Sequence, residues 1–282
     1  MDPAGSWERQ YQQDVGPKVT TLAAAATVAA TRESDSYAAE VLNELAFGPP
    51  TTPGVVLPQS LVGVMGDGRP VETLLSSTVG RARALQQTLP PEHALVEAGA
   101  FMDRIVESLM ADAARAAEEV AMAQRPWVAG YVRVAEPGAC SRCIILAGKF
   151  YLFNEGFLRH PACRCTHLPA PDDAARVKRL IGVNSPERYF ESLGKEEQDR
   201  VFTEAGAQAI REGADIGRVV NARRGMSRAQ SGALVTTEGT TRRGRLPGQK
   251  RGVRLMPESI FAIAGDNREE ALRLLRLHGF IA

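Results

Sequence analysis

The chain has 282 residues, of which 44% are hydrophobic and 24% charged, a composition that is typical of a folded protein and too apolar for general disorder. Its formal net charge is +1, from 34 Lys plus Arg against 33 Asp plus Glu, which by itself predicts no class of partner. Four cysteines are too few for a disulfide scaffold, and no apolar run reaches the ~20 residues that cross a bilayer, which excludes a secreted mini-protein and a membrane protein.

Residues 1–125 are predicted to form a helical N-terminal domain. Early in this part, one helical face is outlined by apolar residues that recur three and four positions apart: Ala38, Val41, Leu42 and Leu45. Prolines from Pro49 onward end that helix, and further helices are expected over 71–89 and 92–124. The third helix carries a stripe of small apolar residues, which is typical either of a bundle core or of a strut for subunit packing.

The character of the sequence changes at residue 126. Residues 128–134 alternate and are β-prone, and residues 143–153 are β-branched and aromatic, so both are predicted strands. Residues 136–138, Glu-Pro-Gly, form a turn between them. Residues 126–170 are therefore predicted to be a small β-containing module within a helical protein.

Short helices are predicted across residues 171–222, and a further helical segment over 255–282. The short helices are expected near residues 186–193, 196–212 and 215–222. Ser185 followed by proline is a helix start, with serine as the N-cap and proline at the first helical position. In the last segment, Asn267 or Asp266 is the expected N-cap.

Residues 223–254 are predicted to be a basic flexible arm. From Arg218 to Arg254 the chain holds ten Lys or Arg and one acid, Glu238, a local balance of +9. The stretch is rich in glycine and has too little apolar surface to offset the entropy of ordering. Its candidate nucleic-acid-binding residues are Arg223, Arg224, Arg242, Arg243 and Arg245. A solvated linker between two helical parts is the alternative interpretation.

All four cysteines lie between residues 140 and 165. Cys140-Ser-Arg-Cys143 is followed, after 16 residues, by His160-Pro-Ala-Cys163-Arg-Cys165. Two such knuckles can direct thiolate and imidazole ligands at one tetrahedral zinc ion. One structural Zn²⁺ per chain would take four of the five candidates, which are Cys140, Cys143, His160, Cys163 and Cys165. Disulfides and reduced thiols packed in a small core are the alternatives. The predicted fold is thus mainly α, with helical N-terminal and C-terminal parts around a small zinc-stapled α+β or β-hairpin module.

The sequence favours a binding module over an enzyme. A Ser-His-Asp protease needs a histidine that can act as base, and His160 is already assigned to the cysteine cluster. His167 is expected at the surface or beside the metal ligands. The motifs Gly-x-Ser-x-Gly, Asp-Thr-Gly and His-Glu-x-x-His are absent, whereas a Ser–Lys pair leaves no signature and stays open. A nuclease centre is disfavoured because a hard cation requires carboxylate or histidine ligands.

The segment 126–170 resembles a family of phage proteins. The resemblance rests on Trp127, on Tyr131-Val-Arg133, on Cys140-Ser-Arg-Cys143 and on Arg159-His160-Pro161-Ala-Cys163-Arg164-Cys165. These residues are similar to those of minor head proteins of tailed bacteriophages related to protein F of phage Mu, above all the actinobacteriophage versions. Those versions are often labelled capsid maturation protease, and such a protease is the alternative function.

The resemblance implies a minor capsid protein present in a few copies per virion. It implies a role in head morphogenesis or genome delivery, with the portal protein or the major capsid protein as partner and no membrane. Packaged phage DNA is a further expected partner, through the basic arm. The expected location is the head interior or the portal vertex, with assembly in the host bacterial cytoplasm.

Overall fold

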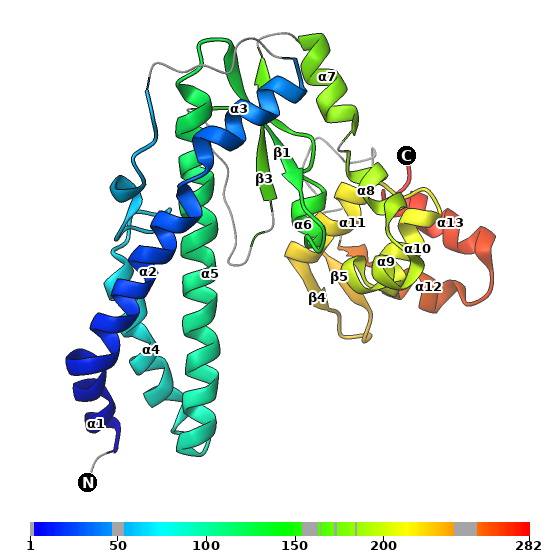
Figure 1. Ribbon diagram of the computed structural model, residues 1–282. Coiled ribbons are helices and arrows are strands. Elements are labelled where there is room, and N and C mark those ends of the chain that lie inside the picture. Colours follow the sequence, from blue (N-terminus) through cyan, green and yellow to red (C-terminus); the bar gives the residue numbers. More distant parts are fainter. Residues whose placement is uncertain are drawn as a thin grey trace. The chain divides into compact units, whose positions relative to one another are not determined.

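The computed structural model describes residues 3–46, 54–153, 163, 165–171, 174–183, 185–239 and 253–282 (Figure 1). The described chain is mostly helical and contains two small antiparallel sheets, so the predicted mainly α class is confirmed. It divides into two compact units, one of Met1–Glu136 with Lys149–Leu180 and one of Pro137–Gly148 with Ile181–Ala282. The five predicted segments are not these two units, and their boundaries stay a prediction.

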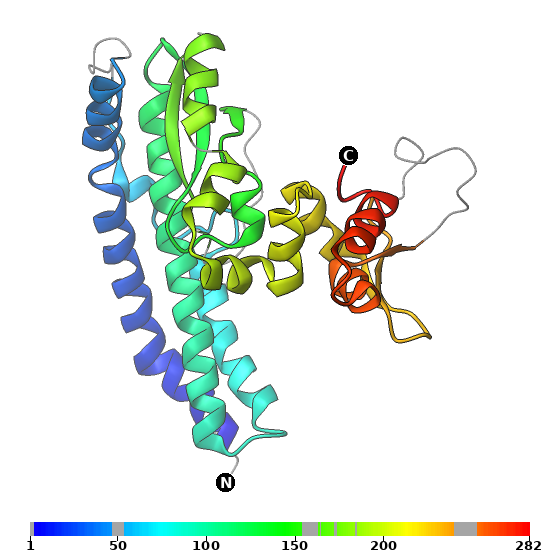
Figure 2. The same ribbon diagram turned by 90° about the vertical axis from the view of Figure 1, so that its right-hand side faces the viewer.

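The first unit is built around one long helix. Its helical elements are α1 (Pro3–Gln10), the π-helical turn η1 (Tyr11–Val15), α2 (Gly16–Thr31), α3 (Ser34–Glu44), the 3-10 turn η2 (Pro58–Leu61), α4 (Val71–Leu85) and α5 (Pro91–Ala123). Figure 2 shows α2, α4 and α5 side by side, and all three pairs are in contact. Helices α4 and α5 agree with the helices predicted over 71–89 and 92–124.

The apolar core of the helical part lies between α2, α4, α5 and η1. It consists of Tyr11, Ala23, Val71, Leu75, Val79, Ile105 and Leu109. Burying a leucine such as Leu75 or Leu109 stabilises the fold by roughly 1.5–3 kcal/mol. Much of the small-residue stripe of α5 is buried within its own chain, which supports the bundle-core interpretation, although Val96 from that stripe is 70% exposed.

A three-stranded antiparallel sheet packs against α5. Its strands are β1 (Val128–Ala135), β2 (Phe150–Leu152) and β3 (Cys165–Pro171), in the order β2-β1-β3. Strand β1 confirms the strand predicted over 128–134. Gly130 is required in β1, because a Cβ there would lie 2.1 Å from the carbonyl oxygen of Tyr151 on β2.

The strand predicted over 143–153 is wrong in its first part. Residues Ser141–Ile144 form the short helix α6, and only Phe150–Leu152 are extended, as β2. The carbonyl of Cys140 accepts hydrogen bonds from the backbone N–H groups of Cys143 and Ile144 and so closes a helical turn. An apolar run of this length fits a buried turn as well as a strand.

The second unit holds α6 and the remaining short elements. Helix α7 (Ala174–Val183) carries the chain into it, and then follow α8 (Pro186–Ser192), α9 (Lys195–Phe202), α10 (Glu204–Arg211), α11 (Ile216–Ala222), the 3-10 turn η3 (Arg223–Gly225), β4 (Met226–Arg228), β5 (Leu234–Thr236), β6 (Arg254–Leu255), α12 (Pro257–Ala264) and α13 (Arg268–Leu277). Strands β4, β5 and β6 form an antiparallel sheet in that order.

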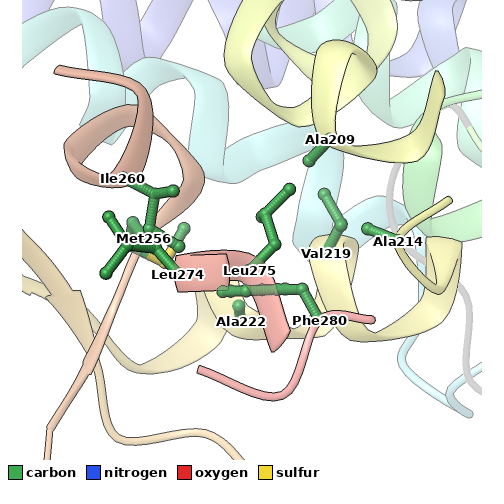
Figure 3. Packing of buried hydrophobic residues seen from close by; sticks show 9 residues of the cluster. All are labelled: Ala209, Ala214, Val219, Ala222, Met256, Ile260, Leu274, Leu275 and Phe280. Carbon is green, nitrogen blue, oxygen red and sulfur yellow. The ribbon is translucent and has the colours of Figure 1, made fainter. Parts of the chain in front are cut away.

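Caps and a compact core fix these helices. The side chain of Ser185 accepts from the N–H of Arg188, and that of Asn267 from the N–H of Glu270, which confirms both predicted caps. The helix predicted over 196–212 is instead two helices, since Thr203 has φ 65° and interrupts it. Figure 3 shows the core that they enclose: Ala209, Ala214, Val219, Ala222, Met256, Ile260, Leu274, Leu275 and Phe280.

The predicted basic arm begins in regular structure. Residues 223–239 contain η3, β4 and β5, and the side chains of Val235 and Thr236 are buried. Residues 240–252 lie outside the described residues, together with Arg242, Arg243 and Arg245. Flexibility of that remaining part stays a prediction.

Candidate metal centre

Three buried cysteines lie close together. The Sγ atoms of Cys143, Cys163 and Cys165 are all within 4.8 Å of one another, and none of the three residues is more than 4% exposed. Such a group can hold a metal ion, since thiolates at this separation can share one. Of the five predicted ligands, the structure therefore gathers three. Cys140 is exposed and does not belong to the group, and His160 lies outside the described residues.

Local chain geometry brings these cysteines into position. Cys165 begins β3 and is paired with Ala135, the last residue of β1. Cys143 follows β1 by one turn and sits in α6. The sheet register therefore places Cys165 beside the end of β1, from which the chain continues to Cys143.

Arg115 of α5 binds the backbone of the segment that carries Cys163 and Cys165. Its Nε donates to the carbonyl of Cys165 at 2.5 Å, and its Nη2 donates to the carbonyl of Cys163. The side chain is 7% exposed and forms an ion pair with Asp112 at 3.2 Å. Because one rigid guanidinium takes both carbonyls, it fixes the spacing between the two cysteines. Arg115 is not among the residues predicted for this site, although a single arginine within Ala113-Ala114-Arg115-Ala116-Ala117 on the buried face of a helix is a usable signal.

A second buried arginine faces the sulfur itself. Arg133 of β1 is 1% exposed, and its Nη2 lies 3.7 Å from the Sγ of Cys163. A guanidinium charge next to a sulfur atom favours the thiolate, which is the form that binds metal. In the sequence, Arg133 stands out only as part of the resemblance to the phage proteins.

His167 is buried beside this site, not at the surface. It is 0% exposed and lies opposite Arg133 in the β1–β3 register. Its Nδ1 is 3.8 Å from Glu118 Oε2 and its Nε2 is 3.5 Å from Glu119 Oε1, so two carboxylates of α5 flank the ring. Of the two expected positions, the surface is wrong and the place beside the candidate ligands agrees with the structure, because β3 pairs with β1 and turns this side chain toward α5.

Tyr37 of α3 contacts the backbone of His167. Its hydroxyl donates to the carbonyl of His167 at 3.2 Å. Burial, followed by the charges of Glu118 and Glu136, raises the pKa of Tyr37 to about 12, so the phenol stays a hydrogen-bond donor at neutral pH. Polar contacts of Tyr37, His167 and Arg115 thus join α3, α5 and β3 and hold the start of β3 in place.

The two described candidate DNA-binding arginines differ in their surroundings. Arg223 forms an ion pair with Glu258, and the same Nη2 donates to Thr203 Oγ1 at 2.6 Å. These internal contacts compete with an external ligand. Arg224 is exposed.

No helix among the described residues combines the length and the apolar character needed to cross a bilayer. The metal-binding capacity of Cys143, Cys163 and Cys165 is thus the clearest chemical feature of the described chain. Compared with protein-family models, with curated proteins and with solved structures, the chain matches none of them.

Proposed function

We propose that this chain is a minor head protein of a tailed bacteriophage, similar to protein F of phage Mu, and acts by binding rather than by catalysis. The observation that carries the proposal is the convergence of Cys143, Cys163 and Cys165 inside residues 126–170, the segment on which the resemblance rests. A buried group of thiols supported by Arg115 suits a structural staple.

We propose zinc as the metal of this site. Thiolate ligands favour zinc over magnesium or calcium, and three thiolates with Zn²⁺ carry a net charge of −1. The guanidinium of Arg133, next to Cys163 Sγ, offsets that charge within a buried site. Zinc would cross-link the connection after β1 to the start of β3. The proposed fourth ligand is His160, because Cys140 is exposed and does not belong to the group of three.

The proposed partners are the portal protein and the major capsid protein. Exposed apolar side chains on the helices of the first unit support docking by these helices, among them Leu22 on α2 at 68% and Leu95 on α5 at 47% exposure. The location that goes with these partners is the head interior or the portal vertex. Packaged DNA is a further proposed partner, through Arg224 and the arginines of residues 240–252.

Mass spectrometry of purified phage particles tests the proposed function. Particles made with the native chain should contain its peptides at a few copies per head. Particles made with Cys143→Ser and Cys165→Ser together should lose the chain or fail to assemble, whereas Cys140→Ser, a matched change at an exposed cysteine, should do less harm. Normal heads that contain no peptide of this chain would refute the proposal.

A second measurement separates binding from proteolysis. Purified chain incubated with the major capsid protein should leave it uncleaved while the two proteins co-sediment. Cleavage that persists after repeated purification and disappears with one Ser→Ala change would instead establish the protease.

A further inference from the structure

A pocket of about 410 Å³ in the second unit is lined by three arginines. They are Arg218 of α11, Arg224 of η3 and Arg254 of β6. The volume lies within the roughly 300–1,000 Å³ of small-molecule clefts. Two acids, Asp215 and Glu238, also line it, so its formal charge is +1.

Arg254 is held rigidly with one donor left over. Its Nε donates to the carbonyl of His278 at 2.6 Å, and its Nη1 donates to the carbonyl of Glu238 at 2.9 Å. Its guanidinium carbon lies 4.5 Å from the ring centroid of Phe280, which is fully buried in the core shown in Figure 3. Among the described residues, the buried Nη2 of Arg254 has no hydrogen-bond partner.

Arg218 is fixed by the carbonyl of Gly279, the residue after His278. Its Nη1 donates to the oxygen of Gly279 at 2.9 Å, next along the chain from the carbonyl that holds Arg254. Burial and then the charge of Arg218 lower the pKa of Arg254, which shows that the two cations lie within each other's field. Arginine does not lose its proton in proteins, so the repulsion between them persists and an anion would relieve it.

The two acids on the pocket wall leave a formal charge of +1. Asp215 is the N-cap of α11, and its Oδ1 accepts from the backbone N–H of Arg218 at 2.7 Å. The carbonyl of Glu238 is engaged by Arg254. Arg224 is exposed and adds a third cation from a different segment of the chain.

We infer that this pocket binds a phosphate group. A planar carboxylate is satisfied by one guanidinium fork, whereas a phosphate has three outward oxygens and takes donors from several directions. Three arginines from α11, η3 and β6 supply such directions. The phosphate belongs either to a small phosphorylated molecule or to the backbone of a nucleic acid. The site does not involve the cysteines and does not depend on the proposed zinc.

Titration of the full chain with inorganic phosphate at low ionic strength tests the inference. Calorimetry should show binding that sodium chloride at equal ionic strength does not reproduce. Arg224→Gln should weaken the affinity about tenfold, the loss expected for one charge-assisted hydrogen bond. The matched control is Arg228→Gln, since Arg228 is exposed, donates to Gly232 and does not line the pocket.

Arg218→Gln should weaken phosphate binding to a similar degree, and Arg218→Lys should restore part of it. Arg218 also contacts Gly279, so thermal melts without phosphate should accompany both variants. No phosphate-specific heat in the native chain, or equal losses in Arg224→Gln and Arg228→Gln, would overturn the inference.

Fluorescence anisotropy with a labelled DNA strand distinguishes the two sources of the phosphate. DNA binding that falls in Arg224→Gln, and that inorganic phosphate competes away, assigns the site to a nucleic-acid backbone. DNA binding that neither change affects, with calorimetric phosphate binding still sensitive to Arg224→Gln, assigns it to a small phosphorylated ligand.

Discussion

Replacing Arg115 with methionine should lower both the stability of the fold and the metal affinity of the cysteine site, although Arg115 is not itself a candidate ligand. The substitution removes the bonds to the carbonyls of Cys163 and Cys165 and leaves both acceptors buried. A hydrogen bond to a charged group contributes about 1.5–3 kcal/mol, so the two together contribute roughly 3–6 kcal/mol. Methionine fills part of the space and removes the cost of burying a cation, which places the expected loss near the lower end, about 3 kcal/mol.

Thermal unfolding followed by circular dichroism measures this effect. For a unit of this size, about 3 kcal/mol corresponds to a fall in melting temperature of roughly 6–12 °C. The metal affinity should fall as well, because the two thiols are no longer held at a fixed spacing. Arg104→Met is the matched control, since Arg104 lies on the same helix and is exposed. Equal melting temperatures and equal metal affinities of Arg115→Met and Arg104→Met would refute a role of Arg115 at the cysteine site.

Three further predictions concern the metal, pH and a glycine. Elemental analysis of reduced protein should find one zinc per chain, with Cys165→Ser abolishing binding and the exposed Cys140→Ser costing less; well under one zinc per folded chain would contradict this. Burial, then Arg254 and Arg273, lower the pKa of His278 below its usual 6.5, so the unfolded state takes up the proton more readily. Stability present above pH ~6.5 should therefore be lost as the pH falls below it, and melts at pH 7.5 and 5.5 should show a smaller difference in His278→Gln. Gly130→Ala should destabilise by more than about 2 kcal/mol because its Cβ would collide with a strand carbonyl, whereas Gly80→Ala on α4, with open space around it, should be neutral or slightly stabilising; equal melting temperatures would refute the first.

Local signals in the sequence were sufficient for several elements. Proline at the start and a stripe of small apolar residues, with no further proline, predict α5 to within one residue at each end. The caps at Ser185 and Asn267 follow from side chains that bond to amides three residues away. Alternation predicts β1, although residues 130–133 in its middle are all buried because β1 is the central strand of its sheet.

The support around the cysteines could not be predicted from local patterns. Arg115 meets Cys165 across 50 residues of sequence, and nothing near either residue specifies that contact. His167 has the local appearance of a polar residue after a loop, and only the β1–β3 register buries it. Likewise, the Cys-x-x-Cys spacing predicts both Cys140 and Cys143 as metal ligands. The helical turn of α6 instead buries Cys143 and leaves Cys140 exposed.

The separation between Arg115 and Cys165 also has a kinetic consequence. A helix such as α5 forms from neighbouring residues within about a microsecond, whereas β3 can pair with β1 only after a long loop has closed. We therefore expect the thiols to meet late in folding. Contacts absent from the transition state slow unfolding and leave the folding rate almost unchanged. A metal held by Cys143, Cys163 and Cys165 should thus slow unfolding around these cysteines without speeding up folding.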